Sequence, residues 1–157
     1  MCPKERRTFF VTTVTANRRR LFQVNANAAL LLDVLRNYRE QGRFALHAFV
    51  VMPDHLHVLL TPAPDISLER ATQFIKGGFS FRLKGKPPVW DRKLQRSADC
   101  HPGKVRIVQE ILRSVQEIHR RTPVRAGLSA CVANYVHSSA NFLEGVDPIP
   151  RHFVGAK

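Results

Sequence analysis

The pattern of apolar and polar positions in the first quarter of the chain predicts a strand followed by a helix. Residues 8–14 are β-branched or aromatic throughout, which is typical of a strand, and a polar, basic turn at 17–20 closes it. From Asn25 to Gln41 the apolar side chains recur at helical spacing. Gly42 follows directly and is expected to stop the helix.

The middle of the chain has the pattern of a hairpin and a second helix. Apolar, β-prone runs at 44–52 and 55–61 are separated only by Pro53-Asp54, a pair with turn chemistry. From Ser67, the expected N-cap, apolar residues return to helical spacing. We expect Gly77-Gly78 to weaken this helix locally.

The second half of the chain completes a mixed fold. Val89-Trp90 would be a short further strand, and residues 104–121 a third helix that Pro123 ends. The order strand, helix, strand, strand, helix, strand fits an α+β fold of the ferredoxin-like (RRM-like) type, with two helices on one face of an antiparallel sheet and the third, C-terminal helix added to that core. A length of 157 residues suits one domain, with a core at about 7–122 and a tail at about 123–157.

A strong positive charge narrows the classes of partner. The chain has 25 Lys and Arg against 12 Asp and Glu, a formal net charge of +13 at pH 7. Nucleic acid is the usual partner of such a surface, because neutralised phosphates release counterions. Membrane headgroups would attract the same charge, but apolar runs such as 45–51 are far below the roughly 20 residues of a membrane span. The start of the chain also lacks the apolar core of a secretory signal, so we expect a cytoplasmic protein with no membrane partner.

The cations gather in three clusters near predicted turns and helix ends, where a phosphate backbone can be reached. The clusters are Arg18, Arg19 and Arg20; Lys76, Arg82, Lys84 and Lys86; and Arg120, Arg121 and Arg125. Isolated lysines are usually solvated surface, but clusters in so basic a chain favour DNA contact. Phe79, Phe81 and Trp90 could stack on unpaired bases. Phe79 suits the core better, which leaves Trp90 as the better stacking candidate.

Two histidines form the candidate metal site. Residues two apart in a strand point to the same side, so His55 and His57 present two imidazoles together while Leu56 and Val58 face the core. This arrangement suits a divalent metal acting as a Lewis acid on a phosphoryl oxygen, with each ring oriented by a hydrogen bond to its other nitrogen. A His-x-His pair also occurs by chance. The turn before it, the basic charge and the order of elements favour the metal site.

The segment M-P-D-H-L-H-V-L-L at 52–60 resembles the His-hydrophobic-His signature of HUH single-strand DNA transposases, especially the REP-associated tyrosine transposases. The resemblance covers nearly the whole chain, with further matches at 9–13, 35–38, 74–81, 89–90, 123–128 and 135–140. It implies a ferredoxin-like domain that binds hairpin-forming single-stranded DNA. It also implies Mg²⁺ or Mn²⁺ held by His55, His57 and a polar residue of a C-terminal helix, whose tyrosine cleaves one strand and leaves a 5′ phosphotyrosine.

The chain departs from the family at that tyrosine. REP-associated members have a pattern like Y-I-x-x-N-P-V-R-A-G-L, whereas this chain has E-I-H-R-R-T-P-V-R-A-G-L at 117–128. Without a gap, Ile118 takes the tyrosine position and Thr122 that of the polar ligand; with a shift of one residue, Glu117 takes the tyrosine position. Neither alignment restores the nucleophile. The third metal ligand could come from Gln116, Glu117 or His119.

Three functions therefore stay open. The first is a transposase domain that recognises structured single-stranded DNA, and the second is a catalytically degenerate relative that only binds DNA. The third is an RNA-binding module, because ferredoxin-like sheets with exposed aromatic residues also bind RNA.

Tyr38 lies on the apolar stripe of the first helix, and the family counterpart of the segment containing Tyr135 does not supply the nucleophile. Whether cleavage survives, and whether the chain forms a homodimer, are left open.

Overall fold

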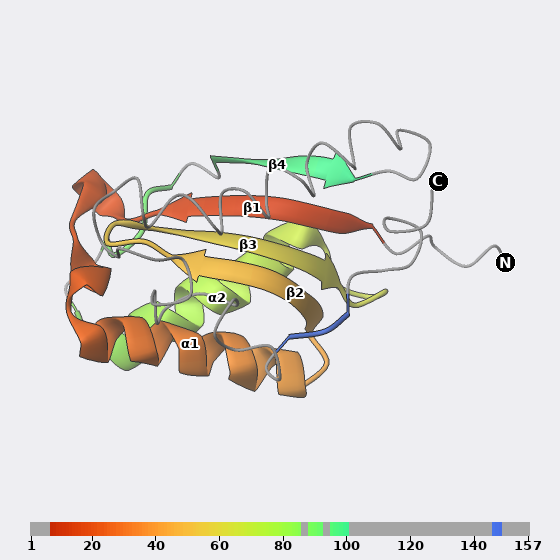
Figure 1. The fold of residues 1–157 in the computed structure, drawn as a ribbon, viewed down its shortest axis with the longest axis horizontal. Coiled ribbons are helices and arrows are strands. Elements are labelled where there is room, and N and C mark those ends of the chain that lie inside the picture. Colours follow the sequence, from red (N-terminus) through yellow and green to blue (C-terminus); the bar gives the residue numbers. More distant parts are fainter. Residues whose placement is uncertain (1–6, 86–87, 93–94, 101–145, 149–157) are drawn as a thin grey trace, which may run out of the picture.

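The computed structural model describes residues 7–85, 88–92, 95–100 and 146–148 (Figure 1). Within these ranges the main elements are β1 (Thr8–Val14), α1 (Asn25–Glu40), β2 (Phe44–Val51), β3 (His55–Pro62), α2 (Leu68–Leu83) and β4 (Gln95–Cys100). Two 3₁₀ helices, η1 (Ala16–Arg18) and η2 (Leu21–Gln23), lie between β1 and α1. The strands form one antiparallel sheet in the order β2-β3-β1-β4, and both α-helices cover the same face of it. The predicted ferredoxin-like α+β fold is confirmed.

The last strand of the sheet lies further along the chain than the sequence pattern predicts. At Val89-Trp90, where a strand is expected, the structure has a single bridge between Thr15 and Trp90. β4 pairs with β1 instead. Its residues, Gln-Arg-Ser-Ala-Asp-Cys, are mostly polar and carry no strand pattern. A strand at the edge of a sheet pairs on one side only, so backbone hydrogen bonds can hold it without an apolar pattern.

Several expected features fall on residues that the structure does not describe. They are the third helix at 104–121, the P-V-R-A-G-L segment at 123–128, Tyr135, and the tail from 123 onward apart from 146–148. Among the helices in the described ranges, none has both the length and the apolar character that crossing a membrane requires.

α1 begins and ends, and α2 begins, close to the residues that the sequence indicates. The Ser67 side chain accepts a hydrogen bond from the Arg70 amide at 3.1 Å and so caps the start of α2. Gly42 follows α1 with a φ of 70° and donates its amide to the Arg39 carbonyl. A left-handed residue at this position satisfies the last carbonyls of a helix, which is why a glycine is favoured there.

The two glycines of α2 do not interrupt the helix, and one of them has a packing reason. A Cβ built on Gly78 would lie 2.7 Å from Cε2 of Tyr38, so the Tyr38 ring of α1 rests directly against the α2 backbone. The same ring stacks on Phe74 with centroids 5.1 Å apart. Tyr38 therefore packs between the helices, in agreement with the core role predicted for it.

The hydrophobic core lies between the sheet and the two helices. Leu56, Val58 and Leu60 of β3 are at most 1% exposed and belong to this core, together with Ile75 and Phe79 of α2. Successive side chains of a strand point to opposite faces, so the residues of β3 that alternate with these three face away from the helices.

Asp147 fastens the described segment 146–148 to α1 and to the edge strand β2. Its carboxylate accepts two hydrogen bonds from the Arg39 guanidinium, both of 2.9 Å, and one from the Leu46 amide at 2.8 Å. Its own amide donates to the Leu46 carbonyl. These bonds occupy backbone groups that an edge strand would otherwise leave open. The hydrogen bond from Arg39 holds the pKa of Asp147 below its usual value despite partial burial.

Asp147→Asn should lower the free energy of unfolding by about 1–3 kcal/mol at pH 7, because it removes a charge-assisted, two-bond contact. The folded-state pKa of Asp147 is depressed, so this contribution is present above the unfolded pKa of about 3.9 and is lost as the pH falls through the folded pKa. Urea unfolding of both proteins at pH 7 and pH 3 measures it. The difference between them should shrink at pH 3, and a constant difference would contradict a role for the charge.

Candidate metal and nucleic-acid site

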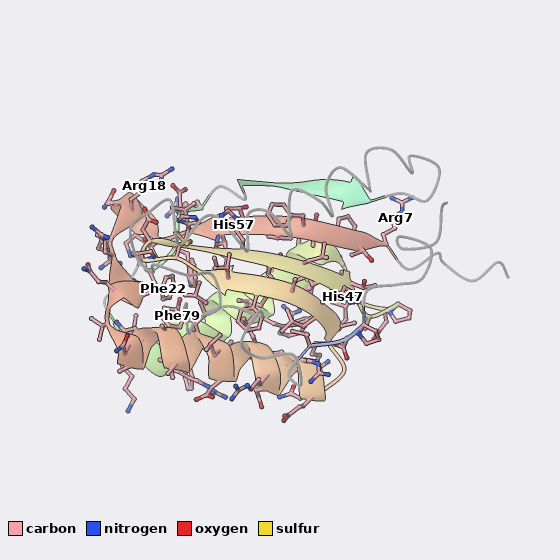
Figure 2. All side chains as sticks on the ribbon, in the orientation of Figure 1. Arg7, Arg18, Phe22, His47, His57 and Phe79 are labelled. Carbon is pink, nitrogen blue, oxygen red and sulfur yellow. The ribbon has the colours of Figure 1, made fainter. Side chains whose placement is uncertain are left out.

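Two imidazoles converge on the face of the sheet opposite the helices. His55 and His57 of β3 flank Leu56, which is buried on the helix side, so both rings project from the other face. His57 is labelled in Figure 2. Their Nε2 atoms lie 3.1 Å apart, and the ring centroids 4.7 Å apart in an edge-to-face arrangement. The structure thus has the shared face that the spacing predicts.

Each ring is held by a partner at its other nitrogen. Nδ1 of His55 lies 2.6 Å from Oδ1 of Asp54, and Nδ1 of His57 lies 2.8 Å from Oγ1 of Thr12. Thr12 reaches His57 because the register of β1 and β3 sets these two residues opposite each other. Phe10, also on β1, stacks on the His57 ring with centroids 5.6 Å apart. Both rings are therefore fixed with their Nε2 atoms turned toward each other.

With both rings neutral, Asp54 sets which nitrogen of His55 carries the proton, whereas Thr12 accommodates either arrangement of His57. The ionised Asp54 carboxylate can only accept, so Nδ1 of His55 is the donor and its Nε2 is an acceptor. The contact between the two rings then has the Nε2–H of His57 as its donor, and Nδ1 of His57 accepts from the Thr12 hydroxyl. A hydroxyl can also accept. Thr12 therefore fits His57 equally well once the proton sits on Nδ1 and the Nε2 lone pair is available to a metal.

Asp54 joins the histidine pair to the first basic cluster. Its Oδ2 lies 3.5 Å from the guanidinium of Arg18, whose side chain is 67% exposed. Burial raises the pKa of Asp54, but the hydrogen bond with His55 and the positive charge of Arg18 outweigh it, and the pKa is lower than usual. From the sequence Asp54 is predicted only as a turn residue, although its place directly before His55 was a usable signal. Thr12 is found only through the strand register.

The histidine pair fits two adjacent positions around one divalent ion. Ligands about 2.1 Å from an ion and about 90° apart lie about 3 Å from each other, and the two Nε2 atoms are 3.1 Å apart. A hydrogen bond at the second nitrogen is the usual arrangement of metal-binding histidines. Within the described ranges, no group of three or more His, Cys, Asp or Glu side chains surrounds the pair. The candidates for a third ligand, Gln116, Glu117, His119 and Thr122, lie outside those ranges, as do the alignment positions of the tyrosine, Ile118 and Glu117.

Backbone hydrogen bonds tie three segments together at the end of the sheet where β3 begins. Thr15 and Phe22 donate their amides to the carbonyls of the turn at 53–54. Residues 88–91, which follow α2, bond to residues 14–19 through the backbone and through the Arg19 side chain. Residues 88–91, which follow the second basic cluster, are thus joined to residues 14–19, which contain Arg18 and Arg19 of the first cluster. This junction lies beside the turn that precedes His55.

The predicted DNA-contacting cations in the described ranges are mostly exposed. Arg18, Arg19, Arg20, Arg82 and Lys84 are all exposed side chains. Arg19 also donates to the Pro88 carbonyl at 2.6 Å. The remaining predicted contacts, Lys86, Arg120, Arg121 and Arg125, lie outside the described residues.

Lys76 differs from the other cations because its ammonium group is used within the fold. It is half-buried and donates to the Asp91 carbonyl at 2.7 Å, and burial lowers its pKa. Lys76 therefore helps to hold the segment after α2, and its contact with DNA stays a prediction.

Trp90 is a core residue, which corrects the prediction that it stacks on bases. It is 7% exposed, and its ring packs against Phe22 and Phe79 at centroid distances of 5.6 and 5.5 Å. Its indole N–H donates to the Lys76 carbonyl at 3.0 Å. Both the apolar body and the polar group of the side chain are thus used inside the fold. Phe79 is buried as expected, whereas Phe81 is 84% exposed.

Comparison with known proteins identifies the family to which this chain belongs. The family model described as "Transposase IS200 like" matches residues 1–98. Among solved structures, the chain is similar to a REP-associated tyrosine transposase bound to a REP hairpin, with a TM-score of 0.71, 20% identity, and coverage of 94% of this chain and 86% of that one. It is also similar to a candidate transposase from Deinococcus radiodurans R1, with a TM-score of 0.54, 20% identity, and coverage of 73% and 94%. No curated protein matches the chain significantly. The two structures support the fold, and the family model covers more than half of the sequence: the chain belongs to the IS200-like transposase family.

Proposed function

We propose that this protein is a transposase-like domain that binds hairpin-forming single-stranded DNA and holds Mg²⁺ or Mn²⁺ with His55 and His57. The observation that carries the proposal is the histidine pair, with its Nε2 atoms 3.1 Å apart and each Nδ1 engaged by Asp54 or Thr12. A solved structure with the same fold is a tyrosine transposase with a bound REP hairpin, which supports a DNA hairpin as the partner. One domain, with a core at about 7–122 and a tail at about 123–157, is part of the proposal.

In this proposal, some residues of the chain orient the metal-binding imidazoles and others attract DNA by their positive charge. Asp54 and Thr12 orient the imidazoles, and the exposed arginines at 18–20 supply positive charge beside the turn that precedes His55. A divalent ion at the two nitrogens would supply Lewis acidity toward a phosphoryl oxygen.

A second candidate function is DNA binding without covalent cleavage. Strand cleavage in the family uses a tyrosine, and the matching positions here hold Ile118 or Glu117, neither of which has a hydroxyl. This departure from the family pattern is the specific observation that favours the second function.

Affinity for a hairpin oligonucleotide should fall steeply with salt, because phosphate contacts release counterions when they form. Arg20→Ala and Lys84→Ala should each reduce the slope of log K against log salt by about one unit. Filter binding over a range of NaCl concentrations measures the slopes. Arg36→Ala, at an exposed arginine of α1 outside the three clusters, is the matched control and should leave the slope unchanged. A flat response of the unmodified protein would contradict phosphate-dominated binding.

A further inference from the structure

The turn after β1 holds two consecutive residues in a backbone conformation that non-glycine residues rarely adopt. Asn17 and Arg18 have φ angles of 56° and 50°, both in the left-handed region. Strain of this kind persists only where surrounding contacts fix it, and it gathers at functional sites. Arg18 lies on the short segment between β1 and α1 (Figure 2). The strained turn therefore points to a role for the Arg18 side chain.

Hydrogen bonds fix the backbone on both sides of Arg18. The amide and hydroxyl of the buried Thr15 lie 2.9 and 3.0 Å from the Asp54 carbonyl oxygen, and the same hydroxyl lies 2.7 Å from the Arg19 carbonyl oxygen. The Arg18 amide donates to the Thr15 carbonyl at 3.0 Å. The Arg19 guanidinium donates to the Pro88 carbonyl at 2.6 Å. The backbone of Arg18 is thus held against the Asp54 turn, while its side chain is mostly exposed.

The Asp54 carboxylate is shared unequally between His55 and Arg18. Its Oδ1 makes a short, charge-assisted hydrogen bond of 2.6 Å with Nδ1 of His55, whereas its Oδ2 lies 3.5 Å from the Arg18 guanidinium. An ion pair of that length with an exposed partner is weak. A phosphate group can accept two shorter bonds from a guanidinium, so it can take Arg18 from Asp54 and leave the bond to His55 in place.

We propose that Arg18 weakens metal binding at the histidine pair until a phosphate group of the bound DNA occupies its guanidinium. While Arg18 pairs with Asp54, it offsets part of the carboxylate charge and places a cation close to His55. Once a phosphate takes the guanidinium, the whole carboxylate charge acts on His55, and a carboxylate at the second nitrogen makes a histidine a stronger ligand. Arg18 is therefore a positioning residue that acts through Asp54. This inference rests on the proposed metal and DNA binding.

The arrangement couples the two binding events. If a phosphate at Arg18 strengthens metal binding, the metal strengthens phosphate binding by the same factor, because coupling between two sites is reciprocal. A direct bond between the metal and a DNA phosphate would couple them as well. The two causes are separated in the protein without DNA, where the charge of Arg18 acts and the direct bond does not exist.

The first measurement is the Mn²⁺ affinity of the full chain without DNA, by isothermal titration calorimetry. Arg18→Ala should raise this affinity by about two- to fivefold, the range expected from loss of one exposed ion pair. Arg18→Lys keeps the positive charge and should stay close to the unmodified protein. If Arg18 only supported Asp54 mechanically, Arg18→Ala would lower the affinity instead.

Arg20→Ala is the matched comparison. Arg20 belongs to the same cluster and is also exposed, but among the described residues Asp54 pairs with the guanidinium of Arg18 and not with that of Arg20. Arg20→Ala should therefore weaken hairpin binding without raising the Mn²⁺ affinity. A rise in both arginine variants would assign the effect to net charge and overturn the role of Asp54.

The second measurement is hairpin affinity with and without Mn²⁺, by fluorescence anisotropy at constant ionic strength. Mn²⁺ should strengthen hairpin binding by the unmodified protein, and Arg18→Ala should reduce that factor by about two- to fivefold, whereas Arg20→Ala should retain it. Sodium sulfate in place of sodium chloride then distinguishes the source of the anion. If sulfate alone raises the Mn²⁺ affinity of the unmodified protein, a free anion is sufficient; if it does not, the DNA backbone is required.

An unchanged or lower Mn²⁺ affinity in Arg18→Ala would overturn the inference and leave the proposed function standing. Circular dichroism of each variant checks that the fold is retained. If the unmodified protein binds no Mn²⁺, the proposed metal site fails, and the inference fails with it.

Discussion

Replacing His55 and His57 together with alanine should abolish Mn²⁺ binding and leave the fold intact. The two Nε2 atoms are the metal-binding groups that the described residues bring together, so no donor pair remains in their place. Both side chains lie on the partly exposed face of β3, and the buried Leu56 between them keeps its core contacts, so folding should survive. Isothermal titration calorimetry measures the binding, and circular dichroism checks the fold. Equal Mn²⁺ affinity in the two proteins would rule out this site.

The partners of the imidazoles should have a smaller, measurable effect. Thr12→Val removes the hydroxyl that holds Nδ1 of His57, and Mn²⁺ affinity should fall by about 10- to 100-fold. Thr13→Val is a matched control one residue further along β1. The Thr13 hydroxyl is buried without a hydrogen-bond partner among the described residues, so its loss should leave metal affinity unchanged and should not destabilise the protein. A general effect of valine on β1 would weaken metal binding in both variants equally.

The unmodified protein should form no covalent adduct with hairpin DNA in the presence of Mn²⁺. An adduct requires a protein hydroxyl that attacks the scissile phosphate, forms a phosphodiester to the protein and releases the 3′ hydroxyl of the other fragment. Ile118 and Glu117, at the family's tyrosine position in the two alignments, have none. Thr122 has a hydroxyl, but its pKa is far higher than the value of about 10 for a phenol, which makes it a poor nucleophile. A denaturing gel with end-labelled hairpin measures the adduct.

A tyrosine restored at the family position should recover a covalent band. Ile118→Tyr tests the ungapped alignment and Glu117→Tyr the shifted one, so the variant that reacts identifies the register. Adding the His55 and His57 alanines to the reactive variant should remove the band, which controls for a non-specific adduct. A metal-dependent band from the unmodified protein would contradict the prediction, and Tyr135→Phe would then be the first variant to test.

Local sequence determined the parts of this protein that depend on near neighbours in the chain. The two-residue period of a strand is enough to put His55 and His57 on one face and Leu56 in the core. The caps at Ser67 and Gly42 are equally local, because each satisfies backbone groups of its own helix. The order of elements then leaves few ways to cover one face of a sheet with two helices, and the ferredoxin-like fold follows.

Tertiary structure alone decided the features that depend on residues far apart in the chain. Thr12 orients His57 only because of the register between β1 and β3, and no local pattern specifies that pairing. Trp90 has the sequence context of an exposed aromatic residue, yet Phe22 and Phe79 enclose its ring. The adjacent glycines of α2 differ for the same reason: Tyr38 lies against Gly78, whereas a Cβ at Gly77 would have no atom of the described residues within 4 Å. Contacts of this kind come from the packing of whole elements, whose side chains meet only after the chain has folded.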